Sequence, residues 1–188
     1  MRLSKILYCL IPFVLLWIIG CANPDEKKAN ELFDEALVLI RSGLYDQALE
    51  TIDSIVNNYP KTELADRLVH GEVTIKGYTY KVFKNNIAPT YIAKEEMRLI
   101  GRALEIYAED NGAYPTNEQG LNALIKKPTL PPQPKNWHGP YIKRTDFNDP
   151  WRNPYQYKLR LKYLDQYYCD LYSYGPNGKE GGDDDIHR

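Results

Sequence analysis

The sequence predicts an α+β protein with an N-terminal helical module followed by a head of one long helix and several short strands. Apolar residues recur at helical spacing from Leu32 to Val56, and again from Ile92 to Tyr107. Apolar and polar residues alternate as in a strand near the C-terminus, most clearly over Tyr167–Tyr174. Ala88-Pro89 separates the two regions, because proline removes a backbone donor and restricts the residue before it. A chain of 188 residues can hold one ordinary domain or two small ones.

Composition excludes some functional classes. The formal net charge of -1 gives no overall field that would attract nucleic acid, so no nucleic-acid partner is expected. The three cysteines, Cys9, Cys21 and Cys169, do not form the pattern of a disulfide framework. Cys169 lies in an apolar-rich strand and is expected to pack as a small hydrophobic residue.

The first 20 residues are expected to be a secretory signal. Residues 1–5 are basic, and the apolar run 6–19 is shorter than the roughly 20 residues that span a bilayer. Ile18-Ile19-Gly20-Cys21 resembles a bacterial lipoprotein box, which implies cleavage before Cys21 and lipidation of that cysteine. Ala22 resembles the outer-membrane sorting choice. The expected location is the cell envelope, in the outer membrane facing the periplasm or the cell surface. An ordinary signal peptide or an uncleaved anchor is the alternative.

A lipidated tether over residues 21–28 is expected to lead into a helical module over 29–86. Gly43 ends a first helix, since glycine readily takes the left-handed conformation needed there, and Tyr59-Pro60 ends a second. Small and aromatic residues at set positions resemble a tetratricopeptide repeat. These positions are Ala36, Gly43, Tyr45, Ala48, Ile52 and Pro60. Any other antiparallel helical hairpin is the alternative.

Residues 62–84 are expected to add a third helix, although Gly71, Gly77 and the β-branched run 73–75 weaken helical propensity. One repeat cannot bury both of its faces, so the remaining apolar face should dock on the head or on a partner. His70 in this segment is expected to be structural or exposed.

The head is expected to span residues 90–188. A long amphipathic helix begins near Tyr91 and ends at Gly112. Thr116 and Gln119 fit a capping box that opens a short helix. Residues 128–134 are too rich in proline for regular structure, and Trp137 should anchor that loop or, alternatively, stack on a ligand.

Three strands are expected, at Tyr141–Arg144, Tyr155–Arg160 and Tyr167–Tyr174, with a variable hairpin over 158–166.

The C-terminal tail carries the residues best suited to bind a metal ion. Gly175, Gly178, Gly181 and Gly182 allow turns that other residues resist, so main-chain carbonyls and nearby side chains can converge. Oxygen atoms from a flexible loop are what Ca²⁺ prefers, at roughly 6–8 ligands. No EF-hand spacing is present, and a solvated acidic tail is the alternative.

Several ordered motifs resemble the major pseudopilin of type II secretion. They are Ala108–Pro128, Asn136-Trp137, Gly139–Arg144, Asp149–Tyr157 and Tyr172–Ile186. The resemblance implies a pilin-type head with the long helix packed across a small antiparallel sheet. It also implies one structural Ca²⁺, held by the carbonyls of Tyr174 and Lys179 and the side chains of Asn177, Asp184 and Asp185.

The chain departs from the pseudopilin pattern at three places. Asn177 replaces the usual aspartate, which removes one negative charge from the calcium site and should weaken binding. Arg152 replaces the usual glycine, so the turn there is expected to differ. The lipoprotein-like start and helical module replace the pseudopilin's assembly helix. Processing by prepilin peptidase and filament growth are therefore not expected.

No catalytic constellation appears. His70, His138 and His187 lie in separate segments, and no nucleophile elbow or phosphate-binding loop is present. The leading interpretation is a lipid-anchored, non-catalytic interaction component of type II secretion or a related pilus machine. Its partners would be pseudopilins, the secretin or a secreted substrate, with the membrane reached through lipid on Cys21. The alternative is an outer-membrane assembly or surface-binding lipoprotein that uses the head only as a scaffold.

Overall fold

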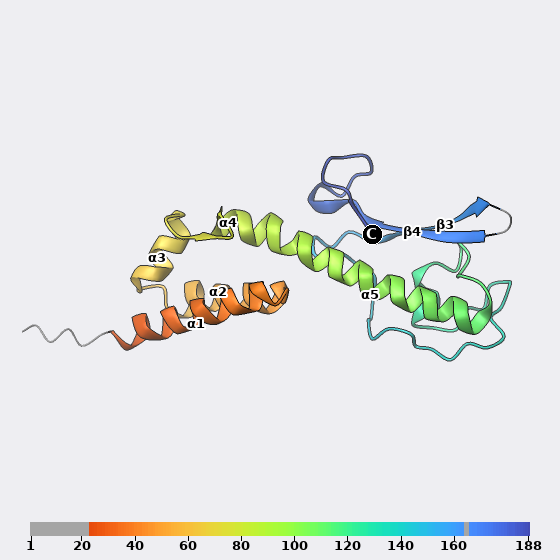
Figure 1. The fold of residues 1–188 in the computed structure, drawn as a ribbon, viewed down its shortest axis with the longest axis horizontal. Coiled ribbons are helices and arrows are strands. Elements are labelled where there is room, and N and C mark those ends of the chain that lie inside the picture. Colours follow the sequence, from red (N-terminus) through yellow and green to blue (C-terminus); the bar gives the residue numbers. More distant parts are fainter. Residues whose placement is uncertain (1–22, 164–165) are drawn as a thin grey trace, which may run out of the picture.

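The computed structural model describes residues 23–163 and 166–188. The expected signal and the lipidation site at Cys21 lie outside these residues. The described chain is elongated, with a helical module and a head joined along one long helix (Figure 1). The helices are α1 (Pro24–Arg41), α2 (Tyr45–Asn58), α3 (Glu63–His70), α4 (Tyr80–Val82) and α5 (Ala88–Asn111), and the strands are β1 (Thr74–Ile75), β2 (Tyr78–Thr79), β3 (Gln156–Tyr163), β4 (Gln166–Ser173) and β5 (Ile186–His187).

Helix α1 begins earlier than expected. The polar stretch predicted to be a tether forms its first turns, because Asn23 caps the backbone N–H of Asp25 and Pro24 stands at the start of the helix. The Glu26 carboxylate then accepts hydrogen bonds from the backbone N–H groups of Glu63 and Leu64, at 2.7 and 3.2 Å. This first turn therefore also caps α3.

Helices α1 and α2 pack closely through small residues. Ala36 and Ala48 are fully buried, and Ile52 fills the space between the helices. Gly43 has φ 77° in the connection, as expected from its position. A helical hairpin is thus present, and its assignment as a tetratricopeptide repeat remains a prediction.

The single helix expected over 62–84 is wrong. Helix α3 ends at His70 because Gly71 turns left-handed, with φ 78°. The β-branched residues that follow form a small hairpin, in which β1 pairs antiparallel with β2 around a turn at Lys76-Gly77. His70 is exposed, as expected, and contacts Asp66.

The expected break at Ala88-Pro89 is also wrong, since the chain is helical from Tyr80 to Asn111. A π-helical turn over Phe83–Ile87 precedes Pro89, with the Ala88 N–H bonded to the Phe83 carbonyl. Pro89 has no N–H for the Asn85 carbonyl four residues earlier. The Trp151 indole Nε1, from the head, donates to that carbonyl at 3.2 Å.

Two apolar cores meet on this continuous helix. Phe83 and Ala88 are fully buried in the core of the helical module, with Ile92 packed against it. From Ala93 onward the buried residues belong to the head. The boundary between the two cores therefore lies inside α5, and the apolar face of the module packs on the first turns of this helix.

In the head, α5 packs on an antiparallel sheet of order β3-β4-β5. Strands β3 and β4 pair over most of their length, so most of the segment expected to be a variable hairpin is regular strand. Tyr141–Arg144 is not a strand; the Tyr141 N–H bonds instead to the Leu124 carbonyl. Strand β5, not expected from the sequence, pairs Ile186 with Ser173.

Loops of the head are anchored as the sequence indicates. Thr116 and Gln119 exchange the two hydrogen bonds of a capping box, although the following segment is a 3-10 turn over Leu121–Leu124. The Trp137 indole donates to the Ala123 carbonyl and contacts Tyr141 edge-on, which supports its role as an anchor.

Cys169 is half-buried against the head core. Among the described helices, none combines the length and apolar character needed to cross a membrane.

Candidate metal site in the C-terminal loop

The candidate site lies in the loop between β4 and β5. This loop opens with a 3-10 turn over Gly175–Asn177 and returns so that β5 pairs beside β4. Gly175 has φ 65°, and a Cβ on it would lie 2.2 Å from the Asp184 carbonyl oxygen. Only glycine fits at this crossing, where the two ends of the loop touch.

Asn177 and Asp184 are in direct contact. The Asp184 Oδ2 accepts from the Asn177 backbone N–H at 3.1 Å, and Asp184 Oδ1 accepts from the Asn177 side-chain amide. The Asn177 Oδ1 accepts from the Lys179 backbone N–H at 2.6 Å. The Asn177 side chain therefore faces Asp184 with its amide nitrogen, whereas its oxygen, the atom that would coordinate a cation, faces the Lys179 N–H.

Asp185 carries the oxygen atom that most clearly suits a cation. Its Oδ2 accepts from the Gly181 N–H at 2.8 Å, whereas its Oδ1 is buried and has no hydrogen-bond partner among the described residues. A buried carboxylate oxygen without a partner is unfavourable. A cation would satisfy it.

The donor set fits a hard cation such as Ca²⁺. Carboxylate, amide and carbonyl oxygens are the ligands that Ca²⁺ takes. Gly182 brings the backbone close to the site, since a Cβ there would lie 2.3 Å from Asp184 Oδ1. No cluster of three His, Cys, Asp or Glu side chains suited to a metal occurs within residues 23–163 and 166–188. The predicted calcium ligands would not form such a cluster, because they include only two aspartates; the other ligands are the Asn177 amide oxygen and two main-chain carbonyls.

The two predicted carbonyl ligands come from residues on either side of the 3-10 turn. Tyr174 directly precedes this turn, and Lys179 follows the left-handed Gly178 that ends it. Asn177 and Lys179 are exposed, whereas Tyr174 is half-buried. Coordination by these carbonyls remains a prediction.

A buried hydrogen-bond network holds the loop in place, and sequence reasoning did not identify it. Asp149, only 4% exposed, accepts through Oδ1 from the backbone N–H groups of Trp151 and Asn153, and through Oδ2 from the Ser173 hydroxyl. The Asn153 amide in turn donates to the Gly175 carbonyl at 2.9 Å. The sequence contained one indication of this network, the Asp-Pro pair at Asp149, because the side chain of an aspartate in a turn often accepts a hydrogen bond from the backbone N–H two residues ahead.

Arg152 lies in this supporting turn. Its φ of 70° is the left-handed conformation that glycine takes without penalty. Arginine therefore takes a backbone conformation that glycine favours at this position.

The surroundings of the loop are polar. A hydrogen bond from the Lys158 ammonium lowers the pKa of the Glu180 carboxyl. On the other side, a hollow of about 400 Å³ lies between the three consecutive aspartates of the loop and the long helix, where Asn86 of the π-helical turn and Thr90 and Lys94 of α5 line it. The loop is therefore accessible to solvent ions.

Comparison with known proteins supports the resemblance. Residues 81–188 match the family described as type II secretion system (T2SS), protein G. Over 98 residues the chain is 50% identical to the type II secretion system core protein G of Pseudomonas aeruginosa, covering 52% of this chain and 66% of that protein. The core protein G of Aeromonas hydrophila is 43% identical over 95 residues, covering 50% of this chain and 64% of that protein.

A solved structure matches as well. The crystal structure of the major pseudopilin from the type 2 secretion system of enterohaemorrhagic Escherichia coli is 35% identical, with a TM-score of 0.49, and the match covers 57% of this chain and 87% of that one. The chain spans less than two thirds of the length of the two curated relatives above. Because the family match covers more than half of its residues, this chain belongs to the type II secretion system protein G family.

Proposed function

We propose that this protein is a non-catalytic component of the type II secretion machinery, in which the helical module and the head present binding surfaces for other envelope proteins. The observation that carries the proposal is the family match over residues 81–188. The relatives are named as core proteins of that system. Candidate partners are pseudopilins, the secretin or a secreted substrate.

Crosslinking tests this role directly. A photoreactive residue placed at the exposed Lys126 of the head should give adducts with pseudopilins or secretin in native membranes. The same residue at exposed Asp34, on the helical module, would report the partners of that module separately. Adducts confined to proteins outside the secretion machinery, from both positions, would refute the proposal.

Calcium is proposed to stabilise the head by closing the C-terminal loop onto β4. When bound, the ion would supply positive charge to the oxygens of Asn177, Asp184 and Asp185 and to the carbonyls of Tyr174 and Lys179. Support comes from the buried Asp185 Oδ1, which has no hydrogen-bond partner in the described part of the chain, and from the proximity of Asn177 to Asp184. Because asparagine carries no charge, we expect a dissociation constant of about 10⁻⁴–10⁻³ M.

Thermal unfolding with added Ca²⁺ measures this effect. At 100 times the dissociation constant the ion should stabilise the folded chain by about 2.7 kcal/mol, which raises Tm by roughly 5–10 °C. Asp184→Asn should abolish most of the shift. Asp183→Asn removes the same charge from the same loop outside the predicted ligand set, and should retain the shift. A wild-type Tm that is unaffected by Ca²⁺ would exclude the site.

Lipidation of Cys21 is proposed as the membrane attachment, on the basis of the lipoprotein-like segment Ile18–Cys21. Each buried methylene contributes about 0.8 kcal/mol, so several acyl chains would hold the protein on the membrane. Incorporation of labelled palmitate into wild type, and its loss in Cys21→Ser, is the expected outcome. Equal labelling of both would refute lipidation at this residue.

A further inference from the structure

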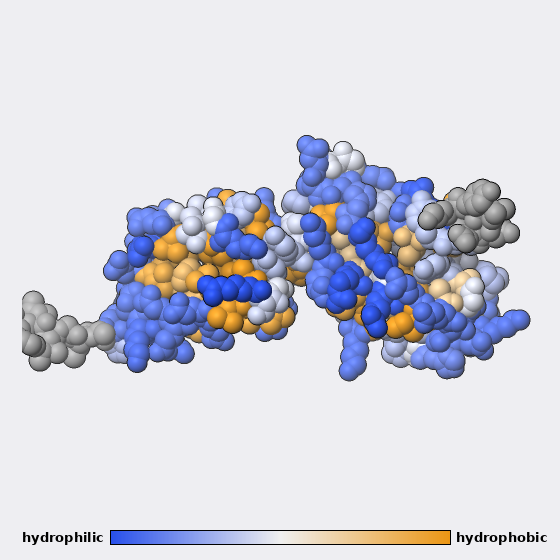
Figure 2. All heavy atoms as spheres, viewed as in Figure 1, coloured by the Kyte–Doolittle hydropathy of each residue, from blue (hydrophilic) through white to orange (hydrophobic). Residues whose placement is uncertain are grey.

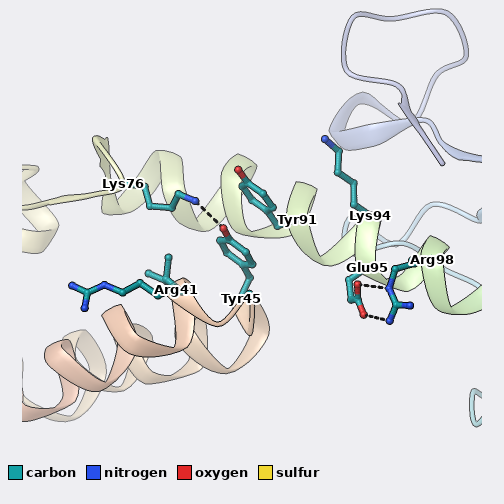
Figure 3. Close-up of a pocket in the computed structure, with 9 residues that line it drawn as sticks. Arg41, Tyr45, Lys76, Tyr91, Lys94, Glu95 and Arg98 are labelled. Carbon is teal, nitrogen blue, oxygen red and sulfur yellow. Dashed lines mark hydrogen bonds and ion pairs between the residues drawn. The ribbon is translucent and has the colours of Figure 1, made fainter.

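A groove separates the helical module from α5. A hollow of about 620 Å³ lies between the α1–α2 connection and the first half of α5, and a second of about 360 Å³ adjoins it. The two share Gly43, Tyr45, Tyr91 and Glu95 in their walls. Figure 3 shows the first hollow, with Arg41 and Tyr45 extending from the hairpin and Tyr91, Lys94 and Arg98 from α5.

Stacked tyrosines form the middle of this groove. The rings of Tyr45 and Tyr91 are parallel, at 3°, with their centroids 4.2 Å apart. The Lys76 ammonium lies 4.9 Å from the Tyr91 centroid and donates to the Tyr45 hydroxyl at 2.9 Å. Since an ammonium has three donors, Lys76 retains hydrogen-bonding capacity toward a ligand.

The charge around the first hollow is strongly positive, although the whole chain has a net charge of -1. Arg41, Lys76, Lys94 and Arg98 line it, and Glu95 is the only acidic residue among the described residues that do so. Glu95 is already engaged by Arg98 in two hydrogen bonds of 2.9 and 2.7 Å. Within the described part of the chain, the other three cations form no ion pair with a carboxylate.

The position of Lys76 carries a conformational penalty. It occupies the first central position of the two-residue β1–β2 turn with φ 52°, followed by Gly77 with φ 82°. Such turns prefer asparagine, aspartate or glycine at that position. Lys76 thus accepts an unfavourable left-handed backbone conformation while its ammonium is directed to the tyrosine pair. Backbone strain of this kind is often found at functional sites.

We propose that this groove binds an acidic peptide segment of a partner protein. Carboxylate side chains of the peptide complement the three cations, and the stacked tyrosine pair forms the surface on which the peptide backbone would lie. The occupant is assigned as a peptide because the adjoining hollow contains Leu44, Leu99 and Ile142, which a phosphate or lipid headgroup would not use. This second hollow also carries charges of both signs, from Asp46, Glu95, Glu96, Lys143 and Arg144. The acidic side chains of the peptide are therefore placed in the first hollow and its apolar side chains in the second. Leu44 and Leu99 are 41% and 45% exposed. Figure 2 shows extensive apolar surface on the helical module, crossed by hydrophilic side chains.

This inference goes beyond the secretion role and does not depend on calcium, because the groove is built from residues outside the C-terminal loop. Lys94 lines both this groove and the hollow beside that loop. The binding assay is therefore run both in chelator and in saturating Ca²⁺.

Fluorescence anisotropy of a labelled peptide tests the proposal on the full-length chain. The probe is a six-residue peptide that repeats Glu-Glu-Leu, and its control repeats Gln-Gln-Leu. We expect the glutamate peptide to bind, the glutamine peptide to bind at least about ten-fold more weakly, and the affinity to fall between about 0.01 and 0.1 M salt, as the screening length shortens from about 30 to about 10 Å.

A matched pair of variants locates the binding site. Replacing Arg41, Lys76 and Lys94 together by glutamine should weaken binding by about ten-fold or more. Replacing the exposed Lys126, Lys127 and Lys135 by glutamine removes the same charge from the head, and should leave binding unchanged. Equal effects of the two triple variants would overturn the proposal.

Two further measurements test the role of Lys76 and the chemical class of the ligand. If the groove variant loses its fold by circular dichroism, the single variant Lys76→Glu replaces it, and should bind a Lys-Lys-Leu repeat more tightly than wild type does. No gain in that variant would count against the groove. Displacement of the probe by inorganic phosphate or phosphatidylglycerol vesicles, as effectively as by unlabelled peptide, would assign the cations to a phosphate ligand and overturn the peptide assignment.

Discussion

Arg152 holds a backbone conformation that its side chain does not favour. Its φ of 70° costs a residue with a Cβ about 1–2 kcal/mol relative to glycine. The turn is retained because Asp149 fixes the neighbouring N–H groups of Trp151 and Asn153. The strain is therefore balanced within a few residues of its origin.

Replacing Arg152 by glycine should stabilise the protein. Strain is relieved, and the added flexibility of the unfolded chain offsets part of the gain, so we expect about 0.5–1 kcal/mol in chemical denaturation. Lys143→Gly is the control, because Lys143 is exposed and its φ is not positive. That variant should be destabilised slightly. A loss of stability in Arg152→Gly would show that the turn is not strained.

Tyr155 links the head's sheet to α5 through a buried hydroxyl. It donates to Glu96 Oε2 at 2.7 Å, and its side chain is 5% exposed. Burial, and next the hydrogen bond to Glu96, raise the pKa of the Tyr155 phenol far above its ordinary value of about 10. Above about pH 10, the tyrosine ionises in the unfolded chain but keeps its proton in the folded protein. The free energy of unfolding therefore falls as the pH rises through this range.

Tyr155→Phe should therefore have two effects. Near neutral pH it removes the hydrogen bond to Glu96 and should lower the free energy of unfolding by about 1–2 kcal/mol. Above about pH 10 its stability should decline less steeply than that of wild type. Denaturant unfolding at neutral and alkaline pH measures both, with the exposed Tyr168→Phe as control. Parallel pH profiles for wild type and Tyr155→Phe would contradict the assignment.

At the scale of elements, the helix from Tyr80 to Asn111 serves two cores. Phe83, in the π-helical turn, and Leu104, in α5, are both fully buried, but in different cores. Through lost burial and the resulting cavity, truncation to alanine should cost about 3–5 kcal/mol at Phe83 and about 2–5 kcal/mol at Leu104. The location of the damage should differ between the two variants.

Hydrogen exchange distinguishes the two truncations. Phe83→Ala should increase exchange mainly in α1–α3, and Leu104→Ala mainly in β3 and β4, because local stability follows the core that has been weakened. Each variant is the other's control, since both remove a large side chain from the same continuous helix. Identical exchange patterns would show that the two cores form one cooperative unit.

Prediction from the sequence succeeded for elements with strong local signals. Gly43 and Gly112 end their helices with positive φ, and Thr116 with Gln119 forms the expected capping box. It failed where distant residues decide the outcome. Pro89 indicates a break by local rules, but Trp151, far along the chain, supplies the donor that lets the helix continue.

At the scale of the whole molecule, the helical module and the head are joined by a helix without a loop. Figure 1 shows both lobes lying along it. The Trp151–Asn85 hydrogen bond and the shared burial of Phe83, Ala88 and Ile92 hold the junction from both sides. We therefore expect the two parts to reorient together in solution.

Residual dipolar couplings test this rigidity. Couplings from α1–α3 and from β3–β5 should fit a single alignment tensor. Replacing Ile87 and Ala88 by glycine should loosen the helix, since each interior glycine costs about 1 kcal/mol, and should give two distinct tensors. Two tensors in the unmodified protein would mean that the junction bends freely.

The sequence by itself determined the α+β class, the helix ends marked by glycine, the family of the C-terminal half and the residues proposed to bind calcium. Each of these depends on short-range chemistry or on an ordered set of motifs. Only the tertiary structure decided the continuity of the helix through Pro89, the pairing of β5 beside β4, the Asp149 network beneath the loop and the cationic groove beside Tyr45. These features depend on contacts between residues far apart in the chain, where packing and hydrogen bonding outweigh local propensity.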